Sequence, residues 1–183
     1  VVFSLGAVVV NFPPLKKDNW RYDKALGGGS LLDAGAYTIH SARNFFQREP
    51  SSVFSKLYNN DHDVDTHGTI LLDFGCTQTA TLSFGFNNHY SNTYSIWGTK
   101  GRITLIGAFS LSNVADTNIL FEHNVNFKNI SEKIECQSDN HFLNEINAFC
   151  DSIRNNNFSE WYEECLNQAI VIDKVASKNP YSR

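Results

Sequence analysis

The segment 79–86 constrains the fold most, because apolar and polar residues alternate strictly along it. On an extended strand, successive side chains point to opposite faces, so the apolar members share one face. The hydroxyl-bearing residues and the glycine between them share the other. The apolar members are Ala80, Leu82, Phe84 and Phe86. A period of two is typical of a half-buried strand in an antiparallel sheet.

The rest of the chain predicts more strands, with helices after the first strand and at the end. Gly98-Thr99-Lys100-Gly101 indicates a hairpin between two of the strands. Strands are predicted at 1–11, 52–58, 66–74, 80–86, 94–97, 102–106, 119–121, 125–130 and 133–136, and helices at 30–46, 142–153 and from Ser159 to about Ala176. We therefore expect an α+β fold with an open-faced, predominantly antiparallel sheet and helices on one face. The other face would be covered by another subunit, in a homodimer or homotetramer.

Length and composition predict one domain over residues 1–183. The chain has a net charge of −4 and 42% hydrophobic residues, which suits a domain with a packed core. No cluster of lysines or arginines suggests a nucleic-acid partner. The longest apolar run is too short to cross a membrane, and no signal segment indicates secretion. The four cysteines match no zinc spacing, so we expect free, buried thiols in a reducing cytoplasm.

The first predicted helix carries polar residues at helical spacing. Asp33, Tyr37, His40 and Asn44 fall on one edge of an otherwise apolar segment. A carboxylate, a phenol and an imidazole on one edge are costly unless they are paired or face a cleft. One interpretation is the proton-relay wall of an active site. The alternative is the ordinary solvated face of a surface helix.

The last two predicted helices carry apolar stripes. Phe142, Ile146, Phe149 and Ile153 follow the spacing of one helical face. On the final helix, for which Ser159 is the predicted N-cap, the expected core face consists of Trp161, Cys165, Ala169, Ile172 and Ala176. Both helices are therefore expected to pack onto the domain.

The connection before the first helix contains candidate binding residues. Ser30 is the expected N-cap, with Asp33 three residues later. The triplet 27–29 is Gly-Gly-Gly, which allows either a close ligand approach to the helix N-terminus or a flexible turn. The segment 20–22, Trp-Arg-Tyr, places a cation between two aromatic residues, which could bind a sugar ring or a phosphate or lie at the surface.

The segment 61–67 is rich in aspartate and histidine. In an extended strand Asp63, Asp65 and His67 would share one side. Their spacing matches no named zinc or calcium loop. We therefore expect a solvated loop that leads into a strand, and no metal site.

Several of these segments together resemble the C-terminal domain of the Gfo/Idh/MocA oxidoreductases. The segment Trp-Arg-Tyr-Asp at 20–23 and the more specific run Gly-Gly-Gly-Ser-Leu-Leu-Asp-Ala-Gly-Ala-Tyr at 27–37 carry the resemblance. Supporting matches are Arg43, Glu49-Pro50, Asp65, the hairpin 96–103 and the late helix at 142–149. The resemblance extends from the first strand to about Ala176 and implies an open sheet like that of the dihydrodipicolinate reductase C-terminal domain.

The resemblance implies an oxidoreductase whose cofactor site lies mostly elsewhere. Family members join such a sheet domain to an N-terminal Rossmann domain, but this sequence contains neither G-x-G-x-x-G nor Glu-Lys-Pro. The cofactor, NAD or NADP, would exchange hydride with a sugar, cyclitol or nucleotide-sugar carbon. By the resemblance, Tyr37 would transfer the hydroxyl proton and Asp33 would orient the substrate. A phenol needs a nearby cation to work near neutral pH, such as a Lys of the missing domain.

We expect the substrate to be bound by residues on and just before the first helix, namely Trp20, Arg21, Tyr22, Gly29 and His40. We also expect the 183 residues alone to be catalytically inactive. Two alternatives stay open: a non-catalytic sugar-binding or dimerisation module, and a hydrolase that uses His40 or His67 with a carboxylate. The hydrolase lacks a nucleophile motif such as G-x-S-x-G.

Overall fold

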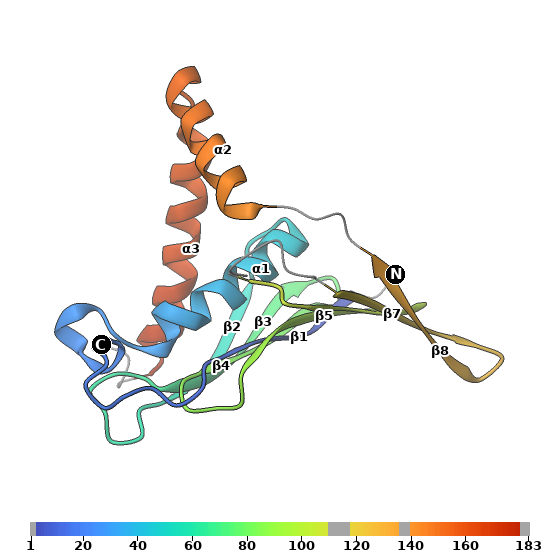
Figure 1. Ribbon diagram of the computed structural model, residues 1–183, viewed down its shortest axis with the longest axis horizontal. Coiled ribbons are helices and arrows are strands. Elements are labelled where there is room, and N and C mark those ends of the chain that lie inside the picture. Colours follow the sequence, from blue (N-terminus) through green and yellow to red (C-terminus); the bar gives the residue numbers. More distant parts are fainter. Residues whose placement is uncertain (1–2, 110–117, 136–139, 180–183) are drawn as a thin grey trace.

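The computed structural model describes residues 3–109, 118–135 and 140–179. Within these residues eight strands form one sheet, in the order β2-β3-β4-β1-β5-β6-β7-β8 (Figure 1). The strands are β1 (Phe3–Asn11), β2 (Ser52–Tyr58), β3 (His67–Gly75), β4 (Gln78–Gly85), β5 (Ser91–Gly98), β6 (Gly101–Ile106), β7 (Asn118–Val125) and β8 (Lys128–Glu135). The predicted fold class is confirmed.

The first strand lies in the middle of the sheet. β1 pairs in parallel with β4, with Val10 opposite Phe84. All other neighbouring strands pair antiparallel, including β1 with β5. A strand in this position has neighbours on both edges, and Val8 and Val10 of β1 are buried on one face of the sheet.

The core lies between one face of the sheet and the first helix. The helices are α1 (Ala36–Phe46), α2 (His141–Asn155) and α3 (Ser159–Ser177). Figure 1 shows all three on the same side of the sheet, with α1 across it and α2 and α3 rising away from it. Val8, Leu82 and Ile39 are fully buried where α1 covers the sheet. The alternation in β4 is confirmed, because its apolar side chains are buried there.

The structure corrects the prediction for the end of the sheet. The predicted strand 125–130 spans a tight turn between β7 and β8, in which Val125 pairs with Lys128. Asn126 and Phe127 both have left-handed backbone conformations, with φ of 50° and 64°, as two-residue hairpin turns require. Phe127 misled the prediction because this apolar residue is fully exposed. Two long strands therefore replace the three short ones.

The structure also corrects the prediction for the last helix. Ser159 is its first residue rather than its cap, and the preceding Phe158 provides no side-chain cap. On the expected core face only Ala176 is buried, whereas Trp161, Cys165 and Ala169 are exposed. The reason is that α3 contacts the domain mainly through its C-terminal third, around Val171 and Val175.

The cysteines within the described residues are free but not buried. Cys76 and Cys165 are exposed and Cys150 is half-buried. The predicted burial is therefore wrong for these three, because they lie on a turn and on the two helices that rise from the sheet. Cys136 lies outside the described residues.

Candidate functional site

The first helix begins with a wide turn that a distant residue caps. Leu31–Gly35 forms a π-helical segment that leads directly into α1. The expected N-cap at Ser30 is wrong, because Ser30 itself has helical backbone angles and makes no such cap. Instead the Asp65 carboxylate accepts hydrogen bonds from Leu31 N and Ser30 Oγ, both at 2.6 Å. The anion at this helix N-terminus therefore comes from the protein itself.

Burial governs the protonation of this cap. Asp65 is 3% exposed, and desolvation raises the pKa of its carboxyl group above the usual value, although the hydrogen bonds from Ser30 and Leu31 oppose the shift. The expectation of a solvated loop at 61–67 is thus wrong for its second half, where Val64, Asp65 and Thr66 are buried. Gly29 packs against this carboxylate, because an added Cβ would lie 2.8 Å from Asp65 Oδ1.

A cavity of about 250 Å³ opens beside the start of α1. It lies on the helix side of the sheet, at the end of β1 and the beginning of β5. Its lining residues are Val10, Phe12, Arg21, Asp33, Tyr37, Tyr90, Ser91, Asn92 and Phe109. Three predicted site residues, Arg21, Asp33 and Tyr37, are therefore brought together in one cavity. Their combination of a cation, a carboxylate and a phenol suits a hydroxylated or anionic ligand.

Arg21 and Asp33 form an ion pair at the edge of the cavity. Arg21 Nε donates to Asp33 Oδ2 at 2.8 Å. The guanidinium group lies 4.6 Å from the centre of the Trp20 ring and 5.9 Å from that of Phe12. Arg21 stands between Trp20 and Tyr22 in the sequence, but its second aromatic neighbour in space is Phe12. Tyr22 stacks on His62 at 4.3 Å.

Tyr37 and Phe109 form the aromatic wall of the cavity. Their ring centres lie 5.7 Å apart. Phe109 also packs against Tyr94, at 6.2 Å, and burial raises the pKa of the Tyr94 hydroxyl. Asn92 is buried behind this wall and hydrogen-bonds to the Phe109 backbone.

Sequence reasoning missed this wall. Asn92, Tyr94 and Ile96 are alternate residues of β5, so their side chains share the face of the sheet that the helices cover. The sequence signal for the wall was Asn92, a polar residue on the buried face of the strand. A buried amide needs hydrogen-bond partners, which here come from the segment that carries Phe109.

His40 lies outside this cavity. Its Nδ1 atom is 3.2 Å from Glu164 Oε1 on α3, in a separate groove between α1 and α3 that Asn44 also lines. The four polar residues that were predicted to share one helical edge therefore lie in two places. Asp33 and Tyr37 line the cavity, and His40 and Asn44 line the groove. The division has a physical cause, since α3 brings Glu164 to His40 and Arg43 in the later part of α1.

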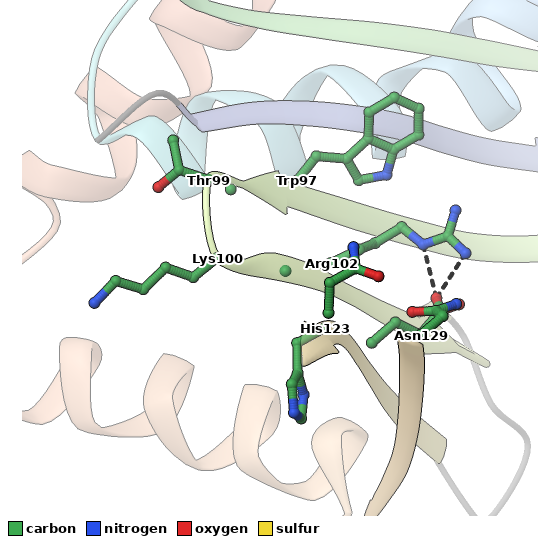
Figure 2. A pocket seen from close by; sticks show the side chains of 10 residues that line it. Trp97, Thr99, Lys100, Arg102, His123 and Asn129 are labelled. Atoms are coloured by element: carbon green, nitrogen blue, oxygen red, sulfur yellow. Dashed lines mark hydrogen bonds and ion pairs between the residues drawn. The ribbon is translucent and has the colours of Figure 1, made fainter. Parts of the chain in front are cut away.

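A larger hollow of about 660 Å³ lies at the opposite end of β5. Figure 2 shows Trp97, Thr99, Lys100 and Arg102 around the β5–β6 turn, with Lys100 directed away from Arg102. Arg102 already donates to Glu122 Oε2, at 2.7 Å from Nε and 2.6 Å from Nη2. Because its cations do not converge and one is paired, this hollow is a weaker candidate for a ligand site than the cavity at Tyr37.

The described part of the chain offers neither a metal-binding cluster nor a membrane-spanning helix. No three histidine, cysteine, aspartate or glutamate residues there lie close enough together to hold a metal ion. None of the helices there combines the length and apolar character needed to cross a membrane.

The open sheet, the capped helix and the cavity beside Tyr37 define an α+β domain with one candidate ligand site, and comparisons with known proteins identify its family. Residues 3–104 match the GFO/IDH/MocA C-terminal domain. The chain therefore belongs to the Gfo/Idh/MocA family, as its resemblance implied.

Relatives of known activity agree with this assignment. The chain is 30% identical over 147 residues to a dTDP-3,4-didehydro-2,6-dideoxy-alpha-D-glucose 3-reductase of Saccharopolyspora spinosa, a match that covers 80% of the chain and 43% of the relative. It is 30% identical over 128 residues to an NADP(+)-dependent D-xylose 1-dehydrogenase of Haloferax volcanii, covering 66% of the chain and 39% of the relative.

A solved structure shares the fold. A 3-ketoreductase from Actinomadura kijaniata, crystallised with NADP and TDP-benzene, superimposes with a TM-score of 0.86 at 28% identity. The match covers 96% of this chain and 53% of the ketoreductase. The chain thus spans about half the length of the curated relatives it matches.

Proposed function

We propose that the chain is the substrate-binding half of an NADP-dependent oxidoreductase that acts on a keto or hydroxyl group of a sugar or nucleotide sugar. The observation that carries the proposal is the convergence of Arg21, Asp33 and Tyr37 in one cavity. The named activities of the relatives support it, because they are NADP-dependent or act on sugars and dTDP-sugars.

The residues of the cavity suggest separate roles in the reaction. A bound nicotinamide would supply the hydride to the carbonyl carbon, or accept it in the reverse direction. The Tyr37 hydroxyl would then give its proton to the carbonyl oxygen, so that the ketone becomes an alcohol. Asp33 would hold Arg21 in place and orient a substrate hydroxyl, and the Arg21 guanidinium would donate to substrate oxygens.

The chain itself provides no dinucleotide fingerprint, since G-x-G-x-x-G is absent from its sequence. We propose that NADP is bound mainly by a second half like that of the relatives, and that the 183 residues alone do not turn over NADPH. Trp20 and Gly29 would act indirectly, through Arg21 and Asp65. Substrate contacts for His40 and Tyr22, and a cytoplasmic location, stay predictions.

We further propose that the face of the sheet opposite the helices associates with a second copy. It exposes Phe54, Leu71 and Trp97 among serines and threonines, each apolar side chain between 41% and 59% exposed. Exposed apolar surface of this kind marks interfaces. Light scattering should show a dimer or tetramer, and Leu71→Glu should shift it toward the monomer. A monomer at micromolar concentration would contradict this proposal.

The test of the reaction is Tyr37→Phe in the complete polypeptide that carries this chain. We expect kcat for keto-sugar reduction to fall about 10²- to 10⁴-fold, the usual contribution of a general acid. Tyr58→Phe is the matched control, because Tyr58 is similarly exposed but stacks on His67 away from the cavity. Full activity in Tyr37→Phe would exclude the assigned role.

A further inference from the structure

The cavity beside Tyr37 contains a second phenol, that of Tyr90, to which the proposed function gives no role. Tyr90 lies in the connection between β4 and β5, lines the cavity and is 54% exposed. We propose that Tyr90 is a specificity-determining residue whose hydroxyl group donates a hydrogen bond to a hydroxyl oxygen of the sugar. The inference rests on the proposed function and adds to it a substrate contact on the side of the sheet.

The orientation of the Asn92 side chain fixes the role of the Tyr90 hydroxyl. Asn92 Oδ1 accepts from Phe109 N at 2.9 Å, and Asn92 Nδ2 donates to Phe109 O. A rotated amide would lose both of these bonds. Asn92 Nδ2 also lies 3.3 Å from Tyr90 Oη. Because an amide nitrogen only donates, Tyr90 Oη is the acceptor in this contact.

The O–H of Tyr90 is therefore available as a donor. A phenol carries one hydrogen-bond donor, and its hydrogen cannot point toward Asn92 Nδ2 while that nitrogen donates to the same oxygen. In the described part of the chain, no residue accepts a hydrogen bond from this O–H. Because Tyr90 is exposed at the cavity, a ligand there can reach the donor.

Hydrogen bonds on both sides of Tyr90 hold the segment that carries it. On one side, Asn87 Oδ1 accepts from Leu15 N at 3.1 Å, and Asn87 Nδ2 donates to the Tyr22 hydroxyl at 2.9 Å. On the other side, the contact with Asn92 holds the phenol itself. A group that is already in place loses little conformational freedom when a ligand binds, which favours specific recognition.

The charge of the cavity favours a neutral oxygen as the ligand of Tyr90. The charged residues among its described lining are Arg21 and Asp33, which pair with each other at 2.8 Å. Phosphate groups are usually bound by arginines or lysines whose charge is free to face them. A hydroxyl group of a sugar therefore suits this part of the cavity better than a phosphate oxygen does.

Tyr90 complements Asp33 in the way that it recognises a hydroxyl group. An ionised carboxylate only accepts, so Asp33 binds a substrate hydroxyl through its hydrogen, whereas Tyr90 binds one through its oxygen. The two residues also lie on different elements, Asp33 in the π-helical segment before α1 and Tyr90 just before β5. Together with Tyr37 they contact the sugar at separate points, which determines the carbon that faces Tyr37.

The experiment is steady-state kinetics of Tyr90→Phe in the complete polypeptide that carries this chain. The probe is the sugar among D-xylose, D-glucose and dTDP-D-glucose that the wild type oxidises fastest with NADP, together with the monodeoxy forms of that sugar. We expect KM for the parent sugar to rise about 3- to 10-fold, the usual effect of one lost hydrogen bond between neutral groups. The value of kcat should change less than about twofold, because the bond is present in both the ground state and the transition state.

The monodeoxy sugars identify the hydroxyl that Tyr90 contacts. For the one that lacks this hydroxyl, the wild type and Tyr90→Phe should have equal KM, because neither can form the bond. The other monodeoxy sugars should keep the difference in KM. A difference that is the same for every monodeoxy sugar would overturn the proposal, and so would a wild-type KM of Tyr90→Phe for the parent sugar.

Tyr58→Phe is again the matched control, since Tyr58 is 47% exposed and lies away from the cavity. It should change KM for none of these sugars. Thermal unfolding tests a merely structural role of Tyr90. We expect Tyr90→Phe to unfold at the temperature of the wild type, because the residue is exposed. A raised KM that is accompanied by a large fall in Tm would overturn the proposal.

The outcome is separable from that of the proposed reaction, because the two tyrosines affect different constants. Tyr37→Phe should lower kcat, whereas Tyr90→Phe should raise KM. Full activity of Tyr37→Phe together with a raised KM of Tyr90→Phe would refute the role of Tyr37 alone. A low kcat of Tyr37→Phe together with an unchanged KM of Tyr90→Phe would refute the role of Tyr90 alone.

Discussion

Asn92 holds Phe109 by both polar groups of its backbone. The Asn92 side chain donates from Nδ2 to Phe109 O at 2.5 Å and accepts at Oδ1 from Phe109 N at 2.9 Å. The backbone carbonyl of Asn92 also accepts from Gly107 N and Ala108 N. A single buried amide on β5 therefore fixes the segment that carries the aromatic wall opposite Tyr37.

Replacement of Asn92 should loosen this wall. We expect Asn92→Ala to lower the free energy of unfolding by about 1–3 kcal/mol, because the Phe109 backbone loses both partners. Asn92→Asp keeps the shape and the acceptor but loses the donor, so its loss should be smaller. Urea unfolding of the chain measures both, with the exposed Asn129→Ala as control. Equal stability of all three variants would show that the amide does not hold the loop.

The Arg21–Asp33 pair should matter for ligand binding more than for folding. Lys at position 21 can reproduce neither the Nε contact with Asp33 nor the planar stacking on Trp20. We expect Arg21→Lys in the complete polypeptide to raise KM about tenfold or more, the effect of one lost charge-assisted hydrogen bond. Stability should change by about 0.5 kcal/mol or less, because the pair is partly exposed.

The matched control for Arg21→Lys is Arg102→Lys. Arg102 is also paired with a carboxylate, on Glu122, but lies at the other end of the sheet. Steady-state kinetics and thermal unfolding of both variants give the comparison. A similar rise in KM for both variants would refute a specific role for Arg21.

The sheet could be predicted from the sequence because its signals are local. The alternation of Ala80, Leu82 and Phe84 is a property of one segment, and it appears as the buried face of β4. The glycines at 98 and 101 likewise predict the β5–β6 turn, which the structure confirms. The strand prediction failed at Phe127, because this exposed apolar residue of a turn was counted as part of a strand.

The site could be predicted only in part because several of its interactions join distant segments. Helical spacing placed Asp33 and Tyr37 together, and both line the cavity. The cap of the same helix comes from Asp65, 34 positions beyond Leu31, and local capping rules assign it to Ser30. His40 follows the same spacing as Tyr37, but α3 brings Glu164 to it.

The burial of Asp65 should make stability depend on pH in the direction opposite to most carboxylates. Because its folded pKa is raised, the folded state binds the proton more tightly than the unfolded state. The stability that results is present in acid and is lost as the pH rises from the ordinary carboxyl value through the raised pKa. Urea unfolding between pH 3 and 8 should show the stability of the wild type falling relative to Asp65→Asn as pH rises. Asp63→Asn, at an exposed aspartate two positions earlier, is the matched control.

The glycine triplet offers a matched pair of backbone substitutions. Gly29 has φ of +120° and an added Cβ would clash with Asp65 Oδ1 at 2.8 Å. Gly27 has φ of +75°, and nothing lies within 4 Å of its added Cβ. Gly27→Ala should therefore cost about 1–2 kcal/mol from left-handed strain alone. Gly29→Ala should cost clearly more in urea unfolding, and equal losses would mean that the Asp65 contact does not restrict this position.

Arg43 joins three parts of the helical layer and should be essential for its stability. Its guanidinium group, 2% exposed, donates to Glu49 and Glu164 at 2.7 Å and to Gln168 at 2.9 Å. The hydrogen bonds that Arg43 donates to Glu49 above all, with help from Glu164, raise the pKa of Arg43 although burial opposes the shift. The group therefore stays charged throughout the pH range in which the protein folds.

We expect Arg43→Ala to lower the free energy of unfolding by about 3 kcal/mol, the lower end for a broken buried ion pair. The lower end applies because Glu49 and Glu164 are partly exposed, so water can solvate them once Arg43 is gone. Arg48→Ala, which removes an exposed arginine five positions later, should change stability by no more than about 0.5 kcal/mol. Urea unfolding that gives the same small loss for both variants would show that Arg43 does not hold α3. The chain just after α3 is also anchored to β2, where Leu57 N donates to Asn179 Oδ1.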